Sequence, residues 1–138
     1  MSVFVYERRV GFADVDAANL VYFPRFFDYC HEAMEALCGT LDGGYVGLIT
    51  GRRIGLPTVH ASADFKAPLR YGDTARIAVS TTKIGDSSAS LRFVLSRARD
   101  GVESAVIDHV VVSTALDTIT KLSLPADVRA LLERHRSS

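Results

Sequence analysis

The chain has 138 residues and a formal net charge of zero, with 48% hydrophobic and 23% charged residues. This length and composition are typical of one soluble globular domain, so we expect a single domain over residues 1–138. The balanced charge argues against binding to nucleic acids or anionic membranes, which usually needs an excess of basic residues. We expect no signal peptide and no membrane-spanning segment, and therefore a cytoplasmic protein.

Residues 3–11 are rich in Val, Phe and Tyr, which predicts a first strand. Pro24 fits the first position of a helix that ends near Gly39. Bulky apolar residues recur in it at helical spacing: Phe26, Phe27, Cys30, Ala33, Met34 and Leu37. We expect this helix to be deeply buried. The glycine-rich residues 40–54 predict a short second helix or an irregular loop.

Cys30 and Cys38 are the two cysteines of the chain, and both fall on the predicted long helix. Eight residues of helix separate their Cα atoms by about 12 Å, at about 1.5 Å per residue. Disulfide-bonded cysteines have Cα atoms closer than about 7 Å. We therefore expect free thiols and a reducing compartment.

The second half of the chain has the pattern of β-structure. Apolar and polar residues alternate in residues 59–66, which predicts a half-buried strand, and residues 74–84 predict another. A turn at 85–88 precedes alternation around Phe93, and Asp100-Gly101 is a hairpin signal. Residues 102–116 predict the longest strand, bent or bulged, and Pro125 begins a short C-terminal helix.

The expected order is therefore a strand, a long buried helix, and four strands joined mostly by tight turns. Tight turns make consecutive strands antiparallel neighbours. We expect an α+β fold in which a five-stranded antiparallel sheet wraps around the long helix.

The segment just before the long helix carries the strongest functional signal. Asp16 lies in a short polar turn between the first strand and Pro24. A carboxylate there can act as a nucleophile or a general base, while backbone N–H groups of the first helical turn bind a developing oxyanion. Asp16 could equally be a helix-capping or turn residue, as could Asp14, which we interpret as a turn or partner-pairing residue.

Two motifs resemble the 4-hydroxybenzoyl-CoA thioesterase family of hot-dog-fold enzymes. The first is Phe12-Ala-Asp-Val-Asp16 followed by Leu20-Val-Tyr-Phe-Pro24 and a helix. The second is Lys66-Ala-Pro-Leu-Arg-Tyr-Gly-Asp73 followed by Ile84-Gly-Asp-Ser-Ser88. The resemblance implies the hot-dog fold and homodimers, often paired again into tetramers, with active sites between subunits. It also implies an acyl- or aroyl-CoA substrate, and it implies that Asp16 is the catalytic carboxylate and that the Phe23 N–H polarises the thioester carbonyl.

The chain departs from the family at two places. Family members commonly have Asp-Pro-x-Gly where this chain has Asp16-Ala17-Ala18-Asn19. Asn tolerates a left-handed backbone better than most residues, so the turn can persist. Many relatives have His where this chain has Phe23, which argues against a histidine-assisted mechanism.

The remaining candidates are substrate-binding residues, each of which could instead have a purely structural role. Tyr22 would line an acyl pocket. One or two basic residues would contact CoA phosphates, with Lys66 and Arg70 favoured over Lys83, Arg92 and Arg97. His31 and Glu35 lie one helical turn apart, and His60 lies on the polar face of a strand. No grouping of His, Cys and carboxylate residues has metal-ligand spacing, so we expect neither a metal nor a cofactor.

The sequence thus supports an acyl-CoA or aroyl-CoA thioesterase, with direct attack by Asp16 and general-base activation of water both open. The altered turn after Asp16 keeps a second hypothesis open, a non-catalytic hot-dog protein that binds acyl-CoA or a partner. A hot-dog dehydratase ranks last, because that chemistry normally uses a His in the loop before the helix.

Overall fold

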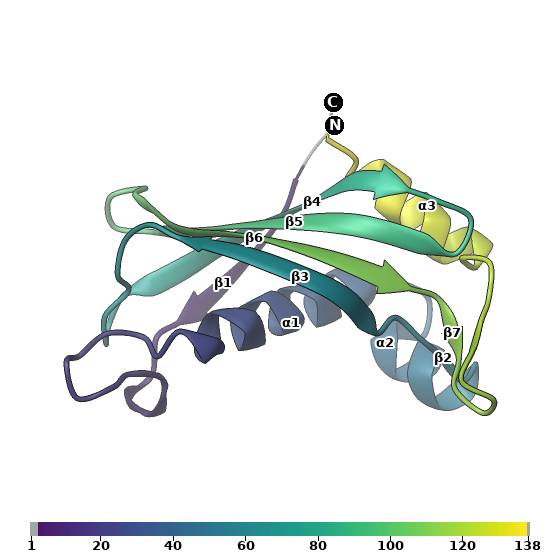
Figure 1. Ribbon diagram of the computed structural model, residues 1–138, viewed down its shortest axis with the longest axis horizontal. Coiled ribbons are helices and arrows are strands. Elements are labelled where there is room, and N and C mark those ends of the chain that lie inside the picture. Colours follow the sequence, from purple (N-terminus) through teal and green to yellow (C-terminus); the bar gives the residue numbers. More distant parts are fainter. Residues whose placement is uncertain (1–2, 138) are drawn as a thin grey trace.

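The computed structural model describes residues 3–137, so residues 1, 2 and 138 of the predicted domain lie outside it. As expected, its main element is a five-stranded antiparallel sheet, and the strand order is β1-β4-β5-β6-β3 (Figure 1). The strands are β1 (Phe4–Arg9), β3 (Thr58–Phe65), β4 (Thr74–Ile84), β5 (Ser88–Arg97) and β6 (Glu103–Val112).

The long helix α1 (Pro24–Cys38) lies along one face of this sheet, which confirms the predicted buried helix (Figure 1). Gly39 caps its C-terminal end through an N–H bond to the Glu35 carbonyl. The buried side chains of α1 are Phe26, Tyr29, Cys30, Ala33, Met34, Leu37 and Cys38. They form one core with inward-facing strand residues such as Val79, Phe93 and Ile107, none of which is exposed to solvent. Burial of this apolar surface is the main force that holds the helix against the sheet.

Short elements complete the fold. After α1 come one turn of helix, α2 (Gly44–Val46), and the π-helical η2 (Gly47–Gly51), where a short helix or loop was expected. The predicted strand 102–116 is interrupted, because β6 is followed by β7 (Thr114–Ala115) in a small sheet with β2 (Ile54–Gly55) and β8 (Thr120–Lys121). The C-terminal helix α3 (Ala126–Arg134) buries Val128, Leu131 and Leu132 as predicted. Within residues 3–137 no helix has the length and apolarity needed to cross a membrane.

Strand β3 differs from the prediction in two ways. It was expected to be half-buried, but seven of its eight residues are exposed, including Val59 at 62% and Phe65 at 48%. The reason is that β3 is an edge strand of the sheet, paired only with β6. It also does not pair with β4, the next strand in sequence, because residues 66–73 carry the chain across the sheet to the position beside β1.

Both cysteines are buried and free, in agreement with the predicted absence of a disulfide. Burial raises the pKa of the Cys38 thiol to about 12 and also raises the pKa of Cys30. Because the thiolate is the reactive form, burial and a raised pKa make both thiols poorly suited to nucleophilic attack at neutral pH.

Candidate active site

Asp16 lies in a loop that links the 3₁₀-helix η1 (Phe12–Asp14) to α1. The loop closes on itself through an antiparallel bridge between Val15 and Val21 and a 2.9 Å bond from the Asp16 N–H to the Leu20 carbonyl. Asp16 Oδ1 accepts hydrogen bonds from the N–H groups of Ala18 (2.9 Å) and Leu20 (3.3 Å). Backbone donors thus hold an exposed carboxylate in one orientation, and Oδ2 accepts no bond from residues 3–137.

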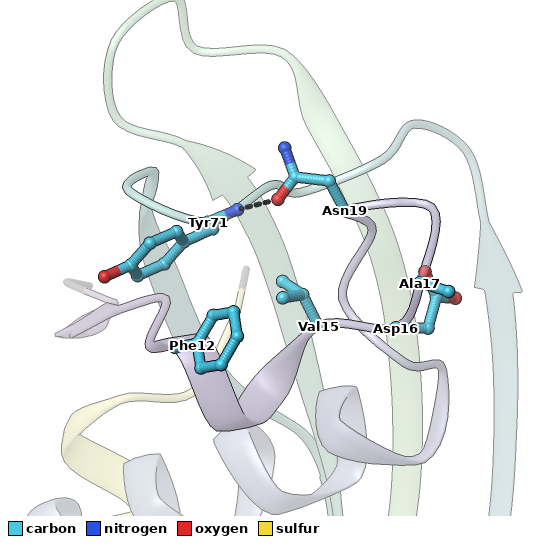
Figure 2. Close-up of a pocket in the computed structure, with 6 residues that line it drawn as sticks. All are labelled: Phe12, Val15, Asp16, Ala17, Asn19 and Tyr71. Carbon is cyan, nitrogen blue, oxygen red and sulfur yellow. Dashed lines mark hydrogen bonds between the residues drawn. The ribbon is translucent and has the colours of Figure 1, made fainter.

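Asn19 preserves the turn where the sequence lacks the family's usual Pro and Gly. Its φ of 63° is in the left-handed region, which Asn adopts more readily than other residues with a side chain. Its side-chain Oδ1 also accepts a 3.4 Å hydrogen bond from the Tyr71 N–H, as Figure 2 shows. The loop is therefore tied to the segment between β3 and β4.

The N-terminus of α1 leaves one backbone donor unused. Pro24 has no N–H, and the N–H groups of Arg25 and Phe26 donate to the carbonyls of Tyr22 (2.8 Å) and Phe23 (3.1 Å). The Phe23 N–H makes no hydrogen bond to any residue in the described part of the chain. A free N–H at a helix N-terminus is suited to binding a carbonyl oxygen that develops negative charge.

A cavity of about 430 Å³ opens on the Asp16 side of the loop. In Figure 2 the rings of Phe12 and Tyr71 form one side of it, and Asp16 and Ala17 lie at the other. The two rings meet edge to face, with 5.7 Å between their centroids. Sequence reasoning did not single out Tyr71, because only the tertiary structure brings it to a loop some fifty residues earlier in the chain.

A second cavity of about 280 Å³ opens on the Phe23 side of the same loop. Its aromatic wall is made by Phe23, Phe26 and Phe65, with ring centroids 6.1 Å apart for Phe23–Phe65 and 5.3 Å for Phe26–Phe65. Lys66 also lines this cavity. Tyr22 is exposed and packs against the Phe23 ring at 5.6 Å. The cavity is therefore mostly apolar with one cationic residue in its lining.

The basic residues proposed for CoA separate into two groups. Lys66 and Arg70 lie at the same end of the molecule as the Asp16 loop, since Lys66 lines the second cavity and Arg70 pairs with Leu20. Lys66 forms a 3.2 Å ion pair with Glu103, whereas the Arg70 guanidinium forms no ion pair within residues 3–137. Lys83 lies at the opposite end of β4, so it does not share this site.

Within one chain, the cavity that Asp16 lines contains none of the three other predicted substrate-binding residues His31, Glu35 and His60. His31 lines a cavity of about 250 Å³ between α1, Thr58 and the buried His109. Glu35 lines a different cavity with Tyr6 and Glu32, and His60 is exposed on β3. No group of three or more His, Cys, Asp or Glu residues suited to a metal ion occurs in the part of the chain that the structure covers.

Comparison with known proteins places this fold and loop in a family. Residues 10–132 match the thioesterase-like superfamily. The chain belongs to this superfamily. A 1,4-dihydroxy-2-naphthoyl-CoA hydrolase from Nostoc punctiforme is 32% identical over 133 residues, which cover 96% of this thioesterase and 88% of the relative.

Solved structures agree with this assignment. A 1,4-dihydroxy-2-naphthoyl-CoA thioesterase from Synechocystis is 31% identical with a TM-score of 0.85, and the match covers 94% of this chain and 95% of that one. A gentisyl-coenzyme A thioesterase is 29% identical with a TM-score of 0.81, covering 91% and 98%. These relatives confirm the hot-dog fold and the hypothesis of a CoA thioester hydrolase.

Proposed function

We propose that this thioesterase hydrolyses an aroyl thioester of coenzyme A to the aromatic acid and CoA, as a member of the 4-hydroxybenzoyl-CoA thioesterase family. One observation carries the proposal: an exposed Asp16 carboxylate and an unused Phe23 N–H lie on the same connection between η1 and α1, and each residue lines a cavity. The relatives named above for dihydroxynaphthoyl-CoA and gentisyl-CoA support the aromatic acyl group.

In the proposed reaction, the Phe23 N–H donates a hydrogen bond to the thioester carbonyl oxygen and stabilises the negative charge that develops on it. Asp16 has two possible roles. It attacks the carbonyl carbon, forming a mixed anhydride and releasing the CoA thiolate, and water then hydrolyses the anhydride. Alternatively, Asp16 removes a proton from the water that attacks the carbonyl, and the C–S bond then breaks to release the CoA thiolate. Both routes need only the substrate and water, so we propose that no cofactor takes part.

The other predicted residues are assigned to substrate binding. Tyr22, beside Phe23, would contact the acyl group, and the cations of Lys66 and Arg70 would contact CoA phosphates at the rim of the site. These cations are exposed, so their contribution would weaken as the salt concentration rises.

We further propose a homodimer formed through the free edge of β3, with two dimers pairing into a tetramer, in the cytoplasm. An exposed edge strand with large apolar side chains tends to pair with another strand. Antiparallel pairing of two copies would place the Thr58 end of one β3 beside the Phe65 end of the other.

This pairing would complete the site. Thr58 and His31 line one cavity of a chain, whereas Phe65 and Phe23 line another. The proposed dimer would therefore bring His31 of the partner subunit toward Phe23, with Glu35 one helical turn beyond His31 and His60 on the paired strand. These three residues would then contact substrate from across the interface.

Purified protein and an Asp16→Asn variant, assayed for thiol release on a panel of acyl- and aroyl-CoAs, test the proposal. We expect the highest kcat/KM with aroyl-CoAs and a loss of about 10²- to 10⁴-fold in kcat for Asp16→Asn. Asp42→Asn is the matched control, because Asp42 is an exposed carboxylate after α1 that lines none of these cavities. Wild-type turnover by Asp16→Asn would reject its role, and saturable binding of CoA esters without any thiol release would favour a non-catalytic binder.

A further inference from the structure

Asp14, two residues before Asp16, is a buried charge that the proposed reaction does not use. It is only 4% exposed and lines none of the cavities described above. Its Oδ2 accepts hydrogen bonds from the Gly11 N–H and the Tyr29 hydroxyl, both 2.9 Å long, and lies 3.3 Å from Arg8 Nη1. Burying a carboxylate costs free energy unless it is paired and hydrogen-bonded, and here it is both.

The backbone of Asp14 bonds to the base of the Asp16 loop. We call this base, formed by Asp14 and Val15 on one side and Val21 and Tyr22 on the other, the neck of the loop. Its carbonyl accepts a 2.9 Å hydrogen bond from the N–H of Tyr22, the residue before Phe23. The next residue on each strand of the neck, Val15 and Val21, forms the antiparallel bridge that closes the loop. Asp14 is therefore bonded to the residue before Phe23 and lies next to the bridge that closes the Asp16 loop.

The side chain of Asp14 joins this neck to the rigid part of the fold. Tyr29 is fully buried in the second turn of α1, and the Arg8 guanidinium lies 5.0 Å from the centre of its ring. Arg8, on β1, also donates a 2.8 Å hydrogen bond to Glu32 on α1. A continuous chain of contacts thus links β1, η1 and α1 at Asp14.

The surroundings of Asp14 favour its charged form. Burial alone would raise its pKa, but the bonds from Gly11 and Tyr29 and the charge of Arg8 outweigh it and leave the pKa below its usual value. A lowered pKa favours the ionised form of Asp14, whose Oδ2 already contacts Gly11, Tyr29 and Arg8. A carboxyl group with a lowered pKa does not fit the role of a general acid, which needs a raised pKa.

We propose that Asp14 and Tyr29 are positioning residues, which hold the Asp16 carboxylate and the Phe23 N–H at the separation that thioester hydrolysis requires. The inference rests on the proposed function of those two groups. A displacement of about 1 Å in a reacting group can reduce a rate by about 100-fold, so a tether this close to the site affects kcat.

Tyr29→Phe and Asp14→Asn test the proposal. Tyr29→Phe keeps the buried ring and removes only the hydroxyl that donates to Asp14. This variant alone tests the proposal if Asp14→Asn does not fold. We expect kcat to fall between about 10- and 100-fold while KM and the Kd for CoA stay within about twofold. The control is Asp127→Asn. Asp127 lies in α3 and forms a 2.7 Å ion pair with Arg52, and kcat of this variant should be unchanged.

A double variant of Tyr29→Phe and Asp16→Asn tests whether the loss of kcat arises through Asp16. If Asp14 and Tyr29 act through Asp16, Tyr29→Phe should lower kcat much less in the Asp16→Asn background than in the wild type. Equal losses in both backgrounds, or a wild-type kcat for both single variants, would overturn the inference. An active Asp16→Asn enzyme would instead overturn the proposed function, whatever Tyr29→Phe does.

Discussion

At the residue scale, two carboxylates two positions apart have opposite environments. Asp16 is exposed and held by backbone N–H groups, whereas Asp14 is buried against Arg8 and Tyr29. The first environment leaves the carboxylate open to a substrate, whereas the second buries it against a cation and a hydroxyl. The burial of neighbouring residues thus separates a reacting group from a structural one within the same motif.

Asn19 tests how much the loop conformation matters. Asn19→Gly should keep kcat within a few-fold, since Gly adopts a positive φ freely and only the bond to Tyr71 is lost. Asn19→Val should cost about 1–2 kcal/mol in backbone strain and lower kcat more strongly, because β-branched residues disfavour this region. Steady-state kinetics of both variants, with circular dichroism to confirm folding, measure the difference. Equal kinetics for both would show that the left-handed turn does not position Asp16.

Lys66 and Arg70 test the binding of CoA. Lys66→Ala and Arg70→Ala should each raise KM several-fold and leave kcat nearly unchanged, because contacts to a remote phosphate stabilise ground state and transition state equally. The increase should shrink at high salt. Arg129→Ala, in α3 at the other end of β4, is the control. A fall in kcat with constant KM would contradict the assignment.

His109 should make stability depend on pH. It is buried beside the Phe27 and Phe93 rings, and burial followed by the charge of His31 lowers its pKa below 6.5, with Asp108 opposing weakly. On acidification, His109 of the unfolded chain therefore takes up a proton at a higher pH than His109 of the folded chain. Its contribution to folding stability is fully present above about pH 6.5 and is lost as the pH falls through the folded pKa. Tm should therefore fall as the pH drops below about 6.5. The plot of Tm against pH should be flatter for His109→Gln. An equally steep plot for that variant would exclude His109 as the cause of the pH dependence.

At the element scale, the exposed strand β3 is the edge through which we propose that two copies of the chain pair. Val59→Lys introduces a charge on this edge without touching the Asp16 loop, and charged edge residues oppose strand pairing. We expect the variant to be monomeric by light scattering and to lose most of its activity while keeping its fold. A dimeric and active Val59→Lys enzyme would place the interface elsewhere.

At the scale of the whole molecule, the proposed site is shared between subunits. Mixing and refolding Asp16→Asn with His31→Ala should create heterodimers in which one of the two sites has both residues intact. Random pairing would give about a quarter of all sites both residues intact, whereas either variant alone has no such site. A mixture no more active than the average of the two variants would show that Asp16 and His31 act within one chain.

Much of the fold was predictable because its signals are local. Helical spacing between Pro24 and Gly39 and alternation around Phe93 report which faces are buried, and both predictions are confirmed. The half-buried prediction for β3 was wrong, because alternation does not reveal whether a strand lies at the centre or the edge of a sheet. Position in a sheet depends on pairing between segments far apart in the chain.

The sequence by itself determined the motif around Asp16, the helix that follows it and the thioesterase chemistry they suggest, since these depend on residues that are neighbours along the chain. Only the tertiary structure decided that Asp14 is bonded to Tyr29, that Tyr71 reaches Asn19, and that His31 and Asp16 lie in separate cavities. The physical reason is that burial and hydrogen bonding arise from contacts between β1, α1 and the crossover at 66–73, which pack together only when the whole core forms.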